Sequence, residues 1–134
     1  MEVSKSLVTG CTVLVADDDE GTRRVLRDML RSAGMNVVGE AGNGVQAFSL
    51  FQKLHPEVVC LDIDMPAMTG LQVLIKIREM KLRAIVLLIT GGVTNSNVHN
   101  AITGHADGII AKPFSAVMVV GEIERAIKRS LAAA

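Results

Sequence analysis

Four short apolar segments of this 134-residue chain each end at a side chain that is able to do chemistry. These side chains are Asp17, Asp18 and Asp19 after CTVLVA, Asp62 and Asp64 after VVCL, Thr90 after AIVLLI, and Lys112 after DGIIA. Carboxylates that crowd together repel one another and require a cation nearby. Because the nearby ligands are oxygens, without histidine or cysteine, a hard metal such as Mg²⁺ is the expected ion.

The same groups are suited to phosphoryl transfer. Mg²⁺ keeps several waters and is usually shared between a few carboxylates and a phosphate. Lys112 offers a point charge to phosphate oxygens, and Thr90 offers a hydroxyl donor. Asp62 stands at the end of the apolar run 58–61 and is the candidate nucleophile, because a carboxylate that attacks phosphorus forms an acyl phosphate. The metal and the lysine would stabilise charge on the transferred group.

The apolar segments have the length and β-branched content of strands that are buried on both faces of a sheet. We predict strands at 11–16, 35–41, 58–61, 84–89 and 107–111, separated by helices around 25–33, 43–54, 71–80, 95–103 and 115–131. Asn43 and Ser115 are predicted N-caps. Strands that alternate with helices require right-handed crossovers and a parallel sheet. The predicted fold is a doubly wound α/β sandwich, which binds ligands at the carboxyl ends of its strands.

Composition is that of a globular domain with no global charge. Hydrophobic residues make up 49% of the chain and charged residues 21%, and Lys plus Arg equals Asp plus Glu at 14 each. This balance provides no field for binding nucleic acid or an anionic membrane. Arg23, Arg24 and Arg27 are therefore interpreted as a solvated helix face. Cys11 and Cys60 are interpreted as buried thiols, because two cysteines in apolar runs do not make a disulfide framework.

The chain is predicted to form one domain. Residues 1–10 are polar and unpatterned and are expected to be a loose arm; the domain covers 11–131, and 132–134 are a tail or cloning remnant. No apolar run approaches the ~20 residues that a membrane span needs. We therefore expect a cytoplasmic protein.

Four motifs, in this order and spacing, resemble the receiver domain of bacterial two-component response regulators. The motifs are VLVADDDE, VVCLDIDMPAMTG, LLIT followed by glycine, and GIIAKPF. The family includes the chemotaxis regulator with a 2-1-3-4-5 sheet. The resemblance covers about residues 11–131 and implies a flavodoxin-like fold, with five parallel strands in the order 2-1-3-4-5 and five helices.

The resemblance implies a role for each acidic residue. Asp62 would be the phosphoacceptor. Asp17 and Asp18 would hold Mg²⁺, together with Asp62 and the backbone carbonyl of Asp64. In the family, the positions of Asp64 and Gly92 tune the lifetime of the phosphoryl group, in a direction that the residues alone leave open.

The resemblance also assigns the remaining strand ends. Thr90 would be the switch hydroxyl that moves toward the phosphoryl group, and Lys112 would pair with that group. The Lys112–Pro113 bond is expected to be cis. The family usually carries an aromatic residue three positions before the lysine, but here that residue is Ile109, which is interpreted as packing on the last helix. The helix at 95–103 has few strong helix formers and is expected to be short or mobile.

The leading hypothesis is a phosphorylatable signalling switch that receives a phosphoryl group from a histidine kinase or phosphotransfer protein. It would catalyse only its own phosphorylation and dephosphorylation and would control an unidentified effector domain or protein, without binding nucleic acid or a membrane itself. A haloacid-dehalogenase-like phosphatase is an alternative, because LDIDM resembles the Asp-x-Asp motif of those enzymes, although they place it on their first strand. A receiver that binds partners without phosphorylation is a further alternative.

Overall fold

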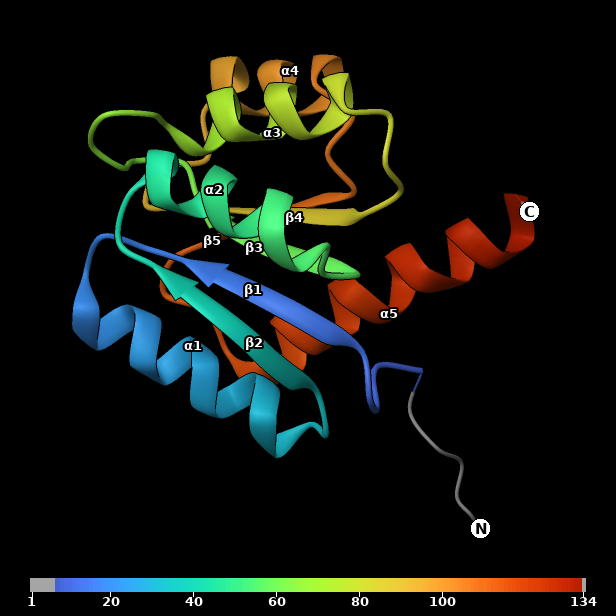
Figure 1. The fold of residues 1–134 in the computed structure, drawn as a ribbon. Helices are drawn as coiled ribbons and strands as arrows, with labels where there is room; N and C mark the ends of the chain where they lie inside the picture. The colour runs from blue at the N-terminus through green and yellow to red at the C-terminus, as the bar shows by residue number, and fades with distance from the viewer. Residues whose placement is uncertain (1–6, 134) are drawn as a thin grey trace, which may run out of the picture.

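A computed structural model describes residues 7–133 and shows an alternation of strands and helices along the chain (Figure 1). Within these residues the elements are β1 (Thr12–Ala16), α1 (Glu20–Ser32), β2 (Asn36–Ala41), α2 (Gly44–Leu54), β3 (Val58–Asp62), α3 (Gly70–Glu79), β4 (Ile85–Thr90), α4 (Asn95–Thr103), β5 (Gly108–Ala111) and α5 (Ala116–Ala133). None of these helices has the length and apolar character needed to span a membrane.

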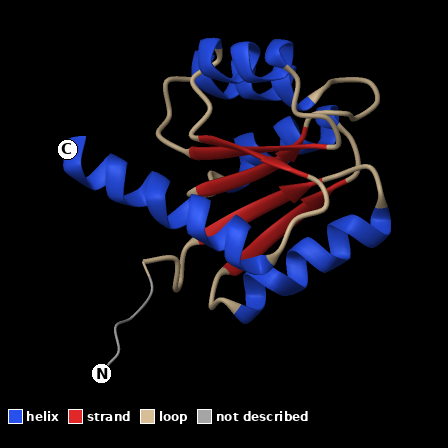
Figure 2. Cartoon of the chain, turned by 180° about the vertical axis from the view of Figure 1, so that it is seen from behind, coloured by secondary structure: helices blue, strands red, loops and turns tan. Residues whose placement is uncertain are grey.

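The strands form one parallel sheet in the order β2-β1-β3-β4-β5. Helices α1 and α5 cover one face of the sheet, and α2, α3 and α4 cover the other (Figures 1 and 2). In the sheet, β2 lies on one side of β1, whereas β3, β4 and β5 lie on the other side. The direction in which successive strands are added to the sheet therefore reverses at β1. This arrangement confirms the predicted doubly wound, flavodoxin-like fold with sheet order 2-1-3-4-5.

The central strand β3 shows why residues 58–61 are all apolar. Val59 and Leu61 lie in the cluster under α2, α3 and α4. Val58 and Cys60 lie in the cluster under α1 and α5. All four side chains are completely buried, because successive residues of a strand point to opposite faces and both faces are covered.

A polar side chain caps the start of each helix at the carboxyl edge of the sheet. In each case a side-chain oxygen accepts a hydrogen bond from the N–H three residues further along the chain, which satisfies one of the free donors of the first turn. The caps are Asp19, Asn43, Thr69, Thr94 and Ser115. The predictions for Asn43 and Ser115 are confirmed. The caps set where the loops between strands and helices end, and these loops carry the polar side chains described below.

The structure corrects the expected position of Ile109. This side chain is half-buried and packs against the cluster under α2, α3 and α4, which includes Leu88 and Ala101. Its neighbour Ile110 instead packs with Val119 in the cluster under α5. A short strand that is apolar on both faces does not reveal which residue faces which helix, and the interpretation that Ile109 packs on the last helix was wrong.

Parts of the predicted arm and tail, residues 7–10 and 132–133, have a defined structure. Leu7–Gly10, within the predicted loose arm, form a turn in which Val8 is completely buried and the Gly10 N–H donates to the Gly34 carbonyl at 2.8 Å. Residues 1–6 of that arm lie outside the described residues. Helix α5 continues to Ala133, through most of the predicted tail.

The two cysteines are unpaired, as expected. Cys60 is completely buried in β3, and burial raises the pKa of its thiol to about 12. Cys11 is only half-buried, which corrects the prediction that both thiols lie in the core.

Candidate functional site

The side chains predicted to do chemistry follow the strands to one edge of the sheet. Asp17 comes directly after β1, and Asp62 is the last residue of β3. Thr90 is the last residue of β4, which begins and ends one residue later than predicted, and Lys112 comes directly after β5. Because these strands are parallel neighbours in register, their ends lie side by side.

Three carboxylates meet at this edge. Asp17, Asp18 and Asp62 each offer an oxygen, and these oxygens all lie within 4.8 Å of one another. Asp17 is 1% exposed and Asp62 is 2% exposed, whereas Asp18 is exposed to solvent. Three acids this close, two of them buried, are unfavourable unless a positive charge lies among them.

The Lys112 ammonium provides a positive charge between the two buried acids. Its Nζ lies 3.0 Å from Asp17 Oδ2 and 3.4 Å from Asp62 Oδ2. Partial burial favours the neutral amine, but hydrogen bonds and charge attraction from Asp17 and Asp62 outweigh it and raise the pKa of Lys112. The lysine therefore remains an ammonium. The peptide bond between Lys112 and Pro113 is cis, as the resemblance implies.

Burial and the neighbouring charge of Asp17 raise the pKa of Asp62 to about 6, despite the opposing effect of Lys112. A backbone hydrogen bond also supports the ionised form, since the Asp64 N–H donates to Asp62 Oδ1 at 3.3 Å. One lysine therefore does not fully compensate the acidic cluster, and Asp62 is held as a carboxylate that a further cation would stabilise.

These residues fit a magnesium ion. Asp17 Oδ2 is buried, and the Lys112 ammonium lies 3.0 Å from it. Three clustered carboxylates share this one ammonium, so the cluster keeps a negative charge that a divalent cation would balance. The available donors are carboxylate oxygens on a partly open edge, as Mg²⁺ prefers. Asp64 is exposed, and its carbonyl stays a predicted ligand.

Thr90 is at the site but turned toward its own loop. The buried hydroxyl donates to the Gly92 carbonyl at 3.0 Å and accepts from the Gly92 N–H at 3.1 Å. Asn97, in the first turn of α4, donates to the same carbonyl at 2.8 Å. The structure therefore brings the lysine and three carboxylates together, and it links Thr90 to the start of α4.

Sequence reasoning missed Arg23. It was interpreted as part of a solvated helix face, but its side chain is only 19% exposed, and its Nη1 donates to the Asp17 carbonyl at 2.8 Å. The one available signal was its spacing, since a long basic side chain in the first turns of a helix can reach back to the preceding loop.

A groove of about 680 Å³ opens directly beside the site. It is lined from α1 by Gly21 and Val25 and from the other side by Lys112, Pro113 and Phe114. Val25 is 50% exposed. The groove therefore combines an apolar wall with access to the ammonium group.

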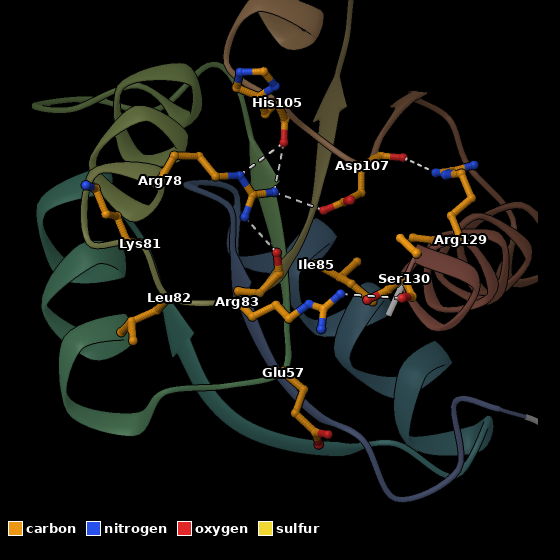
Figure 3. Close-up of a pocket in the computed structure, with 13 residues that line it drawn as sticks. Glu57, Arg78, Lys81, Leu82, Arg83, Ile85, His105, Asp107, Arg129 and Ser130 are labelled. Carbon is orange, nitrogen blue, oxygen red and sulfur yellow. Dashed lines mark hydrogen bonds and ion pairs between the residues drawn. The ribbon is translucent and has the colours of Figure 1, made fainter.

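A second hollow, of about 850 Å³, lies at the opposite edge of the sheet (Figure 3). Three guanidinium groups line it and donate to main-chain carbonyls just before β4 and β5 and near the ends of α4 and α5. These are Arg78, Arg83 and Arg129. Cations near helix C-termini commonly satisfy free carbonyls there, so we interpret this hollow as a place where the fold is braced.

Comparisons with known proteins agree with this geometry. A model of the response regulator receiver domain matches residues 13–124. The chemotaxis protein CheY of Thermotoga maritima is 33% identical over 119 residues, which cover 89% of this chain and 99% of that protein. The signal receiver domain of the response regulator NarL from Mycobacterium tuberculosis is 33% identical, with a TM-score of 0.83 over 90% of this chain and 98% of that one.

A chain of the CheX–CheY–BeF₃–Mg²⁺ complex from Borrelia burgdorferi has a TM-score of 0.87 at 26% identity, over 92% of this chain and 98% of that one. The family match covers most of the residues of the sheet and its helices, and it includes every residue of the acidic cluster and Lys112. The chain therefore belongs to the response regulator receiver domain family.

Proposed function

We propose that Asp62 accepts a phosphoryl group from a histidine kinase or phosphotransfer protein in a Mg²⁺-dependent reaction, and that this switches the conformation of the chain to control an output. The family consists of phosphorylatable signalling switches. The observation that carries the proposal for this chain is the position of Asp62, a buried carboxylate at the end of β3 with Lys112 and two further acids around it.

Each residue of the site would have its own role in the phosphoryl transfer. An Asp62 oxygen attacks phosphorus, so that the new O–P bond forms as the bond from phosphorus to the donor's histidine nitrogen breaks and the imidazole leaves. Lys112, already 3.4 Å from Asp62 Oδ2, would bind a phosphoryl oxygen. Asp17, Asp18 and Asp62 would hold Mg²⁺, which would supply positive charge to the transferred group. Thr90 would leave Gly92 to donate to a phosphoryl oxygen.

The groove between α1 and the β5–α5 loop supports docking of the donor. It opens at Lys112, and its apolar wall includes Val25 and Phe114. A donor helix that presents a histidine needs such a surface, because a phosphoryl group can be transferred in line only when the two proteins are held in register. We also propose a cytoplasmic location, which the two unpaired thiols support.

The phosphatase alternative receives no support. The LDIDM motif starts at the end of β3, the central strand, after a first strand with its own acidic residues, whereas haloacid-dehalogenase-like enzymes carry the motif on their first strand. The complete acidic cluster with its lysine also gives no support to a receiver that works without phosphorylation. We therefore propose that the chain catalyses only its own phosphorylation and dephosphorylation.

A titration with beryllium fluoride, which mimics a phosphoryl group, tests the proposal. In the presence of Mg²⁺, the amide and side-chain NMR signals of Thr90 and Lys112 should shift, and the Asp62→Asn variant should show no such change. Mass spectrometry after incubation with a small phosphodonor should locate the phosphate on Asp62. An intact chain that shows neither the shifts nor the modification would contradict the proposal.

A further inference from the structure

Arg23 joins three elements beside the acidic cluster. It lies one turn into α1, and its Nη1 donates to the Asp17 carbonyl at 2.8 Å. Its Nε lies 3.4 Å from Glu40 Oε1, near the end of β2. The side chain is largely buried between these partners, with 19% exposed. Arg23 therefore links α1 and β2 to the loop that carries two of the clustered carboxylates.

The carbonyl that Arg23 binds belongs to the peptide between Asp17 and Asp18. The N–H of Asp17 is also held, by the Ala41 carbonyl at 3.0 Å. Asp18, in contrast, is exposed, and within residues 7–133 its carboxylate makes no hydrogen bond or ion pair. The direction in which Asp18 points therefore depends on the orientation of the peptide that Arg23 holds.

We propose that Arg23 is a positioning residue for the divalent cation, because it holds the Asp17–Asp18 peptide so that both carboxylates face Asp62. This inference rests on the proposed function, in which that cation is Mg²⁺. Charge alone would have the opposite effect, since a guanidinium beside the site repels a cation. If removal of Arg23 weakens Mg²⁺ binding, the cause is therefore the lost hydrogen bond to the Asp17 carbonyl and not the lost charge.

Arg27 provides a matched control within the same helix. Its Nη1 lies 3.3 Å from Glu40 Oε2, so it shares the carboxylate partner of Arg23. Its other ion pair is with Asp28, and within residues 7–133 no hydrogen bond or ion pair joins it to the acidic loop. Arg23→Met and Arg27→Met both remove one guanidinium from the Glu40 network, but only Arg23→Met frees the Asp17 carbonyl.

The test is a Mg²⁺ titration of both variants and the wild type, followed by calorimetry and by amide NMR signals. Arg23→Met is expected to weaken Mg²⁺ binding roughly tenfold, as is usual when a group that orients metal ligands is removed. Arg27→Met should leave the affinity within about twofold or tighten it. Without Mg²⁺, the Asp18 amide signal should move in Arg23→Met and stay in place in Arg27→Met.

Arg23→Lys keeps the charge and one donor, and its affinity should lie between those of the wild type and Arg23→Met; it also replaces Arg23→Met if that variant does not fold. Equal Mg²⁺ affinity in the Arg23 and Arg27 variants would overturn the inference, as would a variant of Arg23 that loses thermal stability but binds Mg²⁺ like the wild type. A wild type that does not bind Mg²⁺ would overturn the proposed function, and the role of Arg23 with it.

Discussion

Asp62 is the residue at which burial and function oppose each other most directly. The carboxylate is 2% exposed, and burial together with the charge of Asp17 raises its pKa to about 6 from an ordinary value of 3.8. A residue selected only for stability at this position would be uncharged. Lys112 and the Asp64 N–H instead favour the ionised carboxylate, the form that the proposed phosphoryl transfer requires.

The raised pKa predicts how stability changes with pH in the absence of metal. Between pH 4 and 6 the folded chain keeps a proton on Asp62 that the unfolded chain has lost, so the free energy of unfolding should fall as pH rises through this window. Because one pK unit corresponds to about 1.4 kcal/mol, the loss should be on the order of 2–3 kcal/mol. Urea unfolding in the presence of a chelator measures it.

Asp62→Asn should remove this loss and stabilise the metal-free protein at pH 7. Asp64→Asn is the control, since it removes an exposed carboxylate two residues away. Equal pH profiles for the wild type and Asp62→Asn would show that Asp62 is not the group responsible. Added Mg²⁺ should stabilise the wild type at pH 7, because a ligand that binds only the folded state raises its stability.

Gly70 is a second position near the site at which only one residue type, glycine, fits. A Cβ at this position would lie 2.3 Å from the carbonyl oxygen of Asp62 and 3.0 Å from Ile63 Cα, both of which are backbone atoms. Gly70→Ala should therefore displace the end of β3 at Asp62 and destabilise the fold by about 1–3 kcal/mol, as overpacking usually does. Thermal unfolding measures the stability, and the Asp62 amide signal reports the displacement.

Gly121 in α5 is the matched control, because a Cβ there meets nothing within 4 Å. Gly121→Ala should stabilise the protein by about 0.5–1 kcal/mol, because alanine favours a helix interior over glycine. If Gly70→Ala is as stable as the wild type, then the loop after β3 is free to move and the close approach does not constrain Asp62.

At the scale of elements, Arg78 braces the edge of the sheet that lies opposite the site. From the last turn of α3 it donates to the Ala84 carbonyl at 2.7 Å and twice to the His105 carbonyl, and it pairs with Asp107 Oδ2 at 3.0 Å (Figure 3). The same Asp107 oxygen accepts the Val86 N–H at 2.8 Å. One guanidinium therefore ties α3, the start of β4 and the loop between α4 and β5 together.

Arg78→Met should cost about 3 kcal/mol of stability, because it leaves a half-buried carboxylate and two carbonyls without their partner. Hydrogen exchange should accelerate in the loop from 104 to 107. Arg24→Met is the control: its ion pair with Glu20 is more than 60% exposed on both sides, and such pairs contribute about 0–1 kcal/mol. Similar losses in both variants would contradict the bracing role.

The elements themselves could be predicted from sequence because each has a local cause. The run at 58–61 is buried on both faces of the sheet, and Asn43 and Ser115 cap helices whose starts could be read from the pattern. The clustering of the carboxylates could also be predicted, because the carboxyl ends of parallel strands lie at one edge of the sheet. Contacts that depend on side-chain direction could not be predicted, as for Arg23, which reaches back to Asp17, and Ile109, which packs on the side of α2, α3 and α4 rather than α5.

At the scale of the whole molecule, a change at the site must be transmitted to the surface through the contacts around it. Ile109 stands on β5 where the resemblance leads one to expect an aromatic side chain, and it is half-buried against the cluster under α2, α3 and α4. The hydroxyl of Thr90 binds Gly92, and Gly92 is also bound by Asn97 of α4. A direct route therefore runs from Thr90 through the β4–α4 loop to the first turn of α4.

Helix α4 is suited to respond to a change at the site because few of its side chains are buried against the rest of the domain. Of its nine residues only Ala101 is buried, and Gly91 and Gly92 before it have open space around their α-carbons. Its amides should exchange faster than those of α1, as elements with few buried contacts do. When the phosphoryl analogue binds, Thr90 should release Gly92, and exchange and NMR signals should change from 91 to 97.

Thr90→Ala separates this route from the binding event itself. The variant should still bind Mg²⁺ and the phosphoryl analogue through Asp62 and Lys112, but the change from 91 to 97 should be lost, because no hydroxyl remains to move between Gly92 and the phosphoryl group. Thr90→Ser keeps the hydroxyl and should retain the response. If instead the response of α4 survives in Thr90→Ala, then the signal leaves the site through the β5–α5 loop beside Lys112, and α4 follows it rather than transmits it.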